Sequence, residues 1–220
     1  MKVELNKPIL DLNNRLAHEN RERMRAQSIY MLDLLASPGA GKTSLILATI
    51  AALKTSYRIA VIEGDIASDV DAVKIREAGI PAVQINTGGA CHLEAAMIAR
   101  ALEALDLAAL DLIIIENVGN LVCPTDFDLG EDAKAMILSV PEGHDKPLKY
   151  PGVFQVARAV VLNKRDTLPY FDFDETAFAQ SLAELNPHAV LFPLSATEHT
   201  GLEAWTQWLA SQIEEKKLCS

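Results

Sequence analysis

Short apolar runs alternate with segments of helical spacing along most of the chain. Segments such as residues 44–54 place apolar side chains three or four positions apart, as an amphipathic helix does. The alternation of such segments with apolar runs predicts an α/β fold, in which a mostly parallel sheet is covered by helices. The expected strands lie at residues 29–36, 58–64, 81–86, 111–117, 134–140, 157–163 and 188–194, and helical spacing is also found at residues 91–105.

Two segments do not follow this alternation. Residues 9–27 carry Leu12, Leu16 and Met24 among many charged side chains, which predicts a solvated amphipathic helix appended to the core. We therefore expect an N-terminal helical extension, residues 1–27, followed by one domain, residues 28–220. The tract at 139–153 is rich in proline, glycine and charge and is expected to be a loop, without a domain boundary.

Composition and charge narrow the range of functions. A chain of 220 residues with 50% hydrophobic content can bury the core of one α/β domain. The net charge of −10, without a block of lysine and arginine, argues against nucleic acid as a partner. The N-terminus is polar, and no segment approaches the ~18 consecutive apolar residues of a membrane span. We expect a cytoplasmic protein without a membrane partner.

The segment "ASPGAGKTS", residues 36–44, follows the first apolar run and opens a helical one. In a P-loop, glycines let backbone N–H groups converge on phosphate oxygens, a lysine reaches the β- and γ-phosphates and a hydroxyl binds Mg²⁺. The pattern asks for glycine at the position of Ala36, which fits only if its φ is negative. The expected nucleotide contacts are Pro38, Gly39, Ala40, Gly41, Lys42, Thr43 and Ser44.

A second motif, "NKRD" at residues 163–166, indicates which base is bound. Asn163, Lys164 and Asp166 follow an apolar strand, at the edge where open α/β sheets bind ligands. An ionised Asp166 only accepts hydrogen bonds, which suits the N1–H and amino group of guanine and not the acceptor nitrogen of adenine. Ser195 and Ala196 follow the next expected strand and complete the predicted base site.

Together, "SPGAGKT", "EGDIASDVDA", "GGACHLEAA", "ENVGNLVCP", "NKRD" and "LSAT" occur in an order that resembles the HypB family, the nickel-inserting GTPases of hydrogenase maturation. The resemblance extends from about residue 28 to the C-terminus, and "ENVGNLVCP" is its most specific part. It implies a three-layer P-loop NTPase fold and a dimer that hydrolyses GTP with Mg²⁺.

The resemblance also implies roles for three residues around the phosphates. Asp65 matches the switch I carboxylate, and Glu116 matches the Walker B acid. With Thr43 they would form the hard oxygen ligands that suit Mg²⁺. Gly119 would offer its N–H to the γ-phosphate. Asp69 and Asp71 are poorer magnesium candidates, and no water-activating residue is evident.

Cys91 and His92 are adjacent in a chain with three cysteines. Taken alone, the pair is compatible with a metal site, a nucleophile with its base, or two packing residues. The resemblance implies that Cys91, His92 and Cys123 bind nickel or zinc, and thiolate and imidazole ligands suit both metals. Because a closed zinc site normally has four ligands, we expect two protomers to share this one.

The implied function is a GTP-timed metallochaperone for [NiFe] hydrogenase. Its partners would be a second copy of the chain, a nickel-accepting maturation protein and the precursor of the hydrogenase large subunit. Alternatives are a related GTPase that serves urease or a cobalamin mutase, a P-loop kinase of a small substrate, and a scaffold that binds nucleotide without hydrolysis. Two departures from the family pattern matter. The lack of an N-terminal cysteine motif or histidine-rich stretch argues against nickel storage, and Ala96 in place of a further histidine argues against a second metal.

Overall fold

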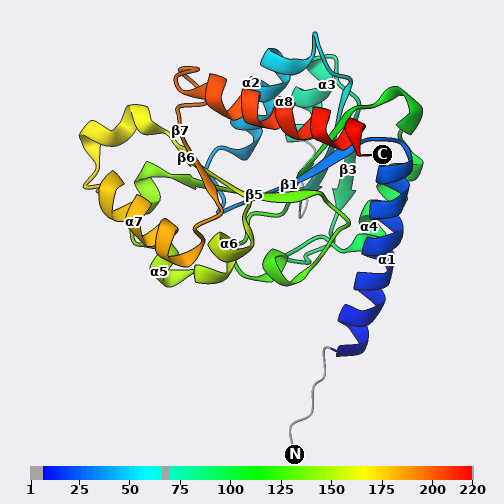
Figure 1. The fold of residues 1–220 in the computed structure, drawn as a ribbon, viewed down its shortest axis with the longest axis horizontal. Coiled ribbons are helices and arrows are strands. Elements are labelled where there is room, and N and C mark those ends of the chain that lie inside the picture. Colours follow the sequence, from blue (N-terminus) through cyan, green and yellow to red (C-terminus); the bar gives the residue numbers. More distant parts are fainter. Residues whose placement is uncertain (1–6, 66–69, 220) are drawn as a thin grey trace, which may run out of the picture.

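The computed structural model describes residues 7–65 and 70–219. In this part of the chain, seven parallel strands form one sheet in the order β3-β2-β4-β1-β5-β6-β7, with helices on both faces (Figure 1). The strands are β1 (Tyr30–Ala36), β2 (Ile59–Asp65), β3 (Ala82–Asn86), β4 (Leu112–Glu116), β5 (Ala133–Ser139), β6 (Ala159–Asn163) and β7 (Val190–Pro193). The helices are α1 (Lys7–Ala26), α2 (Lys42–Leu53), α3 (Val70–Glu77), α4 (Ala95–Glu103), α5 (Lys146–Lys149), α6 (Pro151–Val156), α7 (Glu175–Leu185) and α8 (Leu202–Leu218), with 3₁₀ turns η1 (Leu107–Ala109), η2 (Cys123–Asp126), η3 (Val140–Glu142) and η4 (Arg165–Tyr170). The predicted three-layer α/β class and all the predicted strands are confirmed.

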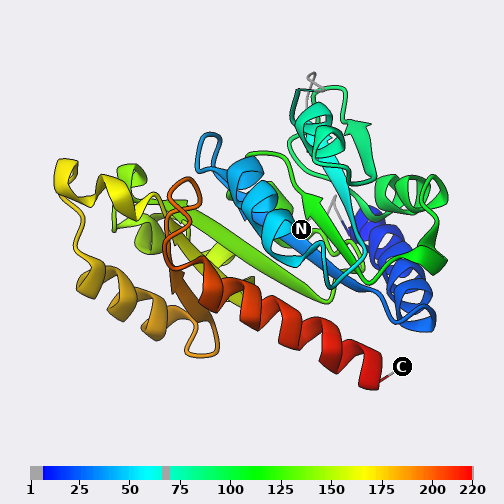
Figure 2. The same cartoon turned by 90° about the horizontal axis from the view of Figure 1, so that it is seen from above.

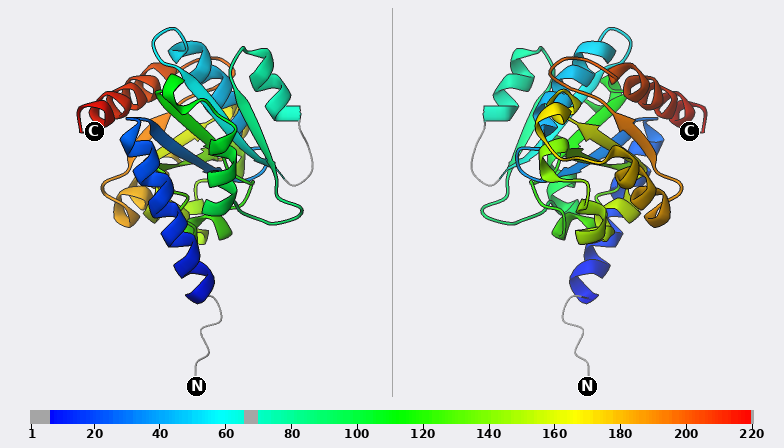
Figure 3. Two further views of the ribbon diagram at one scale, coloured as in Figure 1. Left: turned by 90° about the vertical axis from the view of Figure 1, so that its right-hand side faces the viewer. Right: turned by 90° about the vertical axis from the view of Figure 1, so that its left-hand side faces the viewer.

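The two faces of the sheet form separate cores because successive strand side chains point to opposite faces. In β1, Leu32 and Leu34 pack with α2 and α8, whereas Met31 packs with α1 and α4 on the other face. At the β6–β7 end, this second face is covered by α6 and α7, which supply Phe154 and Phe178. Figure 2 shows α8 and α2 side by side, and Figure 3 shows α8 on the face opposite α1.

The predicted N-terminal helix is present as α1, but it packs against α4 and the core, so the expectation that it is only a solvated appendage is wrong. Met24 is fully buried, whereas Leu12, which was expected on the apolar stripe, is 49% exposed. Two asparagines, Asn13 and Asn20, occupy the buried side instead, where their amides are hydrogen-bonded. The helix lies beside α4 (Figure 1). It ends at Ala26, and the division of the chain after residue 27 stays a prediction.

Two further expectations need local correction. The helix expected over residues 91–105 begins only at Ala95, so that Cys91 and His92 lie in the preceding loop. The tract at 139–153 is not only loop, because prolines at the first helical positions begin short helices there, and Phe154 of α6 is buried. Among the described residues, no helix combines the length and the apolar character needed to cross a bilayer.

Candidate functional site

The P-loop lies between β1 and α2, as predicted. Gly39 and Gly41 have φ values of +78° and +98°, a region in which side chains are strained. A Cβ on Gly41 would also lie 2.5 Å from Asn163 Nδ2. Ala36 is the last residue of β1, is fully buried and does not have a positive φ. An alanine therefore fits at the position where the P-loop pattern has its first glycine.

A cavity of about 550 Å³ opens at the carboxyl ends of β1, β2 and β4. Ala40 does not line this cavity. Its side chain is 1% exposed, and its carbonyl accepts a hydrogen bond from Asn163. Every other predicted phosphate or magnesium residue lines the cavity, namely Pro38, Gly39, Gly41, Lys42, Thr43, Ser44, Asp65, Glu116 and Gly119. The structure therefore brings the phosphate loop and both predicted carboxylates to one space.

The donor set on this wall suits a small hard cation. Thr43 Oγ1 donates to Glu116 Oε1 at 2.9 Å, and Asp65 is half-buried at the end of β2. A hydroxyl and carboxylates are the oxygen ligands that Mg²⁺ prefers beside nucleotide phosphates. Asp69 and the side chain of Asp71 lie outside the described residues.

One acidic residue of the cavity was missed at the level of the sequence. Glu63 is 2% exposed, lines the cavity and is the Cα partner of Glu116 across β2 and β4. The available signal was a charged residue within an otherwise apolar run, which is unusual for a strand buried on both faces.

The loop after β4 touches the phosphate loop at Gly119. A Cβ added at Gly119 would lie 2.9 Å from Pro38 Cγ and 3.1 Å from Pro38 N, closer than side chains approach backbone. The close approach of the two loops thus requires glycine at position 119. Because they are in contact, a displacement of one loop would displace the other.

A second cavity, of about 240 Å³, lies beside the "NKRD" motif and is lined by Ser44, Asn163, Lys164, Asp166 and Ala196, together with Gly41 and Thr197. Asn163 Nδ2 donates to Ala40 O at 2.9 Å and Asn163 Oδ1 accepts from Ala196 N at 3.1 Å. Lys164 Nζ donates to Gly39 O at 2.6 Å. These bonds tie the base-side motif to the phosphate loop.

Asp166 and Ser195 differ in how they relate to this cavity. Asp166 lines it, and its buried Oδ1 has no hydrogen-bond partner among the described residues. Ser195 is fully buried and outside the lining; its hydroxyl contacts Thr197 Oγ1 at 3.3 Å and accepts from Glu198 N. Thr197, the last residue of "LSAT", lines the cavity and was not singled out from the sequence.

Cys91, His92 and Cys123 converge from two loops. Their ligand atoms all lie within 4.8 Å of one another, and Cys91 Sγ is 3.6 Å from His92 Nδ1. Cys91 is exposed and Cys123 half-buried, which excludes simple core packing. Hydrogen bonding to Cys123 is the main cause that raises the pKa of the Cys91 thiol. Three soft ligands in one place favour a metal site over an isolated Cys–His dyad.

Neighbouring side chains orient the cluster. The His92 ring stacks on Phe127, with ring centroids 3.9 Å apart. Asn120 Nδ2 donates to Cys91 O at 3.3 Å, and Asn120 Oδ1 accepts from Val122 N at 2.8 Å, so this side chain bridges the two ligand loops. Such supporting contacts fix the direction in which metal ligands point.

Comparison with known proteins agrees with this geometry. The family model "CobW/HypB/UreG, nucleotide-binding domain" matches residues 32–193. The hydrogenase maturation factor HypB of Escherichia coli is 49% identical over 210 residues, which cover 96% of this chain and 72% of that protein. The hydrogenase/urease maturation factor HypB of Helicobacter pylori is 41% identical, over 97% of this chain and 89% of that protein.

A solved structure shows the same fold at substantial sequence identity. The crystal structure of HypB from Helicobacter pylori in complex with nickel superposes with a TM-score of 0.88 at 40% identity, and covers 92% of this chain and 95% of that one. The sequence and structural matches together cover the P-loop, the base-side motif and the Cys/His cluster. The chain belongs to the CobW/HypB/UreG nucleotide-binding family and, within it, to the HypB hydrogenase maturation factors.

Proposed function

We propose that this protein is a GTP-hydrolysing metallochaperone that helps insert nickel into [NiFe] hydrogenase. The observation that carries the proposal is the continuity of one short segment. It begins at Glu116 on the wall of the larger cavity, passes Gly119 at the phosphate loop and ends at Cys123 in the metal cluster. A change at the phosphates therefore reaches a metal ligand within a few residues.

The smaller cavity supports guanine as the base. The buried Oδ1 of Asp166 is an acceptor without a partner among the described residues, and a guanine N1–H would satisfy it. In this proposal Asn163 and Lys164 hold the base side against the phosphate loop, and Ala196 lines the base. Ser195 supports the turn through its contact with Thr197.

The larger cavity supports Mg²⁺ and the triphosphate. Thr43, Asp65 and Glu116 would hold the cation, which neutralises charge on the phosphate oxygens during hydrolysis. Lys42 would contact the β- and γ-phosphates, and the N–H of Gly119 the γ-phosphate. The remaining P-loop residues, Pro38, Gly39, Ala40, Gly41 and Ser44, would shape the loop and supply backbone N–H groups.

We propose nickel as the cargo of Cys91, His92 and Cys123, by analogy with the nickel complex of the Helicobacter pylori protein. Zn²⁺ suits the same ligands. Three ligands leave a coordination sphere incomplete, and the exposure of Cys91 and of Val122, which is 57% exposed, makes the cluster accessible to a second protomer. A nickel- and GTP-dependent homodimer would share the site.

The cycle that we propose takes place in the cytoplasm, where thiols stay reduced. GTP would draw Gly119 inward, shift Cys123 relative to the Cys91–His92 loop and change the affinity for nickel; hydrolysis would then time release. The recipients would be a nickel-accepting maturation protein and the hydrogenase large-subunit precursor. We also retain the division into a helical extension, residues 1–27, and a GTPase domain, residues 28–220.

Equilibrium dialysis tests the function directly. The amounts of Ni²⁺ and Zn²⁺ per protomer are measured with GDP and with a non-hydrolysable GTP analogue, for the wild type, Cys91→Ala and Cys123→Ala, beside phosphate release from GTP. Metal binding that depends on both cysteines and changes with the nucleotide supports the proposal. Equal nickel affinity in both nucleotide states would contradict nucleotide timing, and cysteine-independent metal would contradict the site.

Urease is a second candidate recipient, because the Helicobacter pylori relative is named a hydrogenase/urease maturation factor. The two are distinguished by the partner that co-purifies with the tagged chain. Recovery of a urease maturation protein in place of a hydrogenase one would favour the second candidate.

A further inference from the structure

An ion pair is buried on the face of the sheet that α1 and α4 cover. Asp33 of β1 and Lys134 of β5 are Cα partners, and Lys134 Nζ lies 2.9 Å from Asp33 Oδ2. Asp33 is fully buried, and the Lys134 side chain is 9% exposed. Burial lowers the pKa of Lys134, but attraction to Asp33 and Glu131 outweighs it and holds the pKa above its usual value. Such a buried charge pair contributes little net stability, so its position calls for another reason.

Asn117 connects this pair to the nucleotide side. It follows Glu116, and its N–H bonds to Leu34 O, so the strand ladder continues through it. Side chains therefore alternate at this point: Glu116 bonds to Thr43 at the larger cavity, and Asn117 reaches the opposite face. There Asn117 Nδ2 donates to Asp33 at 3.0 Å.

The other end of the Asn117 amide reaches the loop that carries His92. Asn117 Oδ1 accepts from Leu93 N at 3.4 Å and from Val118 N at 2.9 Å. Val118 lines the larger cavity, and Leu93 is the residue directly after His92. Asn117 thus joins the cavity wall, the ion pair and the metal-ligand loop through one buried side chain, which is 1% exposed.

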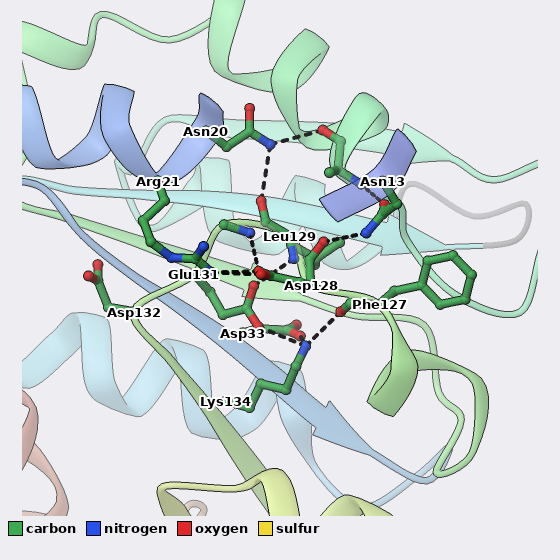
Figure 4. A network of polar contacts seen from close by, with 12 residues as sticks. Asn13, Asn20, Arg21, Asp33, Phe127, Asp128, Leu129, Glu131, Asp132 and Lys134 are labelled. Atoms are coloured by element: carbon green, nitrogen blue, oxygen red, sulfur yellow. Dashed lines mark hydrogen bonds and ion pairs between the residues drawn. The ribbon is translucent and has the colours of Figure 1, made fainter. Parts of the chain in front are cut away.

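Lys134 closes the connection from the other side. Its Nζ donates to Phe127 O at 3.0 Å, and the Phe127 ring stacks on His92. Figure 4 shows Lys134 between Asp33 and the Phe127 carbonyl. Glu131 receives Lys134 Nζ at 2.9 Å and Leu129 N at 2.7 Å, which fixes the turn after Phe127. The contacts form a closed ring through Asn117, Asp33, Lys134, Phe127, His92 and Leu93.

Helix α1 holds the segment that follows Phe127, and Figure 4 shows its Asn13 and Asn20 bonded to that segment. Asn13 Nδ2 donates to Asp128 O at 2.7 Å, and Asn20 Nδ2 donates to Leu129 O at 3.0 Å and to Ala95 O at 2.9 Å. These bonds hold the segment after Phe127 against the start of α4. The ring is thus fixed by α1 near Phe127, and it adjoins the larger cavity at Asn117.

We propose that Asn117, Asp33 and Lys134 are positioning residues that transmit the state of the nucleotide cavity to His92. Displacement of Val118 and Gly119 by a γ-phosphate would move the Asn117 amide, which is bonded to both Asp33 and Leu93 N. Tightly packed polar networks pass such shifts on because their bonds have few alternative arrangements. This inference rests on the proposed function, and it adds a route to His92 that is separate from the direct path along the chain to Cys123.

The test compares matched variants by their nickel affinity in two nucleotide states. Asn117→Leu and Asn117→Ser remove the amide, and Lys134→Met removes the ammonium. Asn186→Leu is the amide control, since Asn186 donates to the carbonyls of Phe154, Gln155 and Ala157, outside the ring. Lys216→Met is the lysine control, because Lys216 pairs with Asp132, also outside the ring.

The measured quantity is the ratio of Ni²⁺ dissociation constants with GDP and with a non-hydrolysable GTP analogue. We expect a wild-type ratio that departs from one by about fivefold or more. The controls should keep this ratio, whereas the Asn117 and Lys134 variants should bring it at least about twofold closer to one while still binding both nucleotides, because the direct path to Cys123 remains. The double variant Asn117→Leu/Lys134→Met should change this ratio no more than either single variant does, because both substitutions break the same ring.

A second readout needs no metal. The ring signals of isotope-labelled His92 are followed by NMR in the GDP and analogue states, and we expect a shift in the wild type that Asn117→Ser abolishes. This variant removes no buried charge and decides the question if Lys134→Met does not fold. A wild-type change that persists in the folded variants overturns the relay alone. A wild type without any nucleotide-dependent change overturns the relay together with nucleotide timing.

Discussion

The nucleotide cavities and the metal cluster are built in different ways. The cavities are shaped mainly by backbone in contiguous motifs, such as the positive φ angles of Gly39 and Gly41 and the carbonyls that receive Asn163 and Lys164. The metal cluster comes from two separate loops. It is supported by side chains from α1, β1 and β5, which are distant in the sequence. We therefore expect the cavities to respond to local substitutions and the cluster to respond also to remote ones.

Lys42→Ala should have the largest effect and should separate the two regions most clearly. In the proposed function it removes the cation that contacts the β- and γ-phosphates, so GTP hydrolysis should fall by about a hundredfold or more. Nickel stoichiometry in the GDP state should be unchanged, because Lys42 has no part in the cluster. Phosphate release and equilibrium dialysis check the two halves. Loss of nickel binding in this variant would show that the metal cluster depends on the nucleotide cavity.

Cys123→Ala tests the separation from the other side. Nickel affinity should fall by about tenfold or more, since one of three soft ligands is lost. Affinity for GDP should stay within about twofold, because the thiol lies outside both cavity linings. Isothermal titration with Ni²⁺ and with GDP measures both values. An equal loss of nucleotide binding would mean that the cluster holds the cavity open.

Nickel binding at the metal cluster should depend on pH because one of its ligands is a thiol. The raised pKa of the Cys91 thiol keeps it protonated near neutral pH, whereas nickel binds the thiolate. Binding therefore releases a proton, and nickel affinity should weaken as the pH falls, by up to about tenfold per unit for this thiol. Cys91→Ala should flatten the profile. A profile of the same slope in that variant would assign the proton to His92 or Cys123.

Gly130→Ala is the remote substitution and should have the smallest effect on nickel. Gly130 has φ +92°, and an added Cβ would lie 2.5 Å from Ala17 O and 2.7 Å from Asn20 Cβ, so α1 must move. We expect a loss of about 1–3 kcal/mol in the free energy of unfolding and a few-fold loss in nickel affinity. GDP affinity should not change.

Gly79→Ala is the matched control for that substitution. Gly79 has φ +82° but open space around its Cα, so the change adds backbone strain without moving α1. Denaturant unfolding and nickel titration compare the two variants. Equal nickel affinity in both would show that α1 does not support the cluster.

The sequence by itself determined the sheet, its covering helices and the nucleotide motifs. Strands buried on both faces are continuous apolar runs, and a P-loop requires particular residue types at fixed spacing, so both are visible locally. The location of Asp166 at a cavity also followed from its position after a strand. The placement of Ser195 did not, because its burial depends on the turn around Thr197.

Only the tertiary structure decided how the metal cluster is supported. Asn13 and Asn20 are polar, and nothing in the local pattern indicated that neighbouring loops bury and bond them. Asp33 and Lys134 stand in apolar strands without any local sign of a partner, since pairing depends on strand order and register. Likewise, periodicity reports which side of an element is buried, and the contacts made there depend on which elements are brought together.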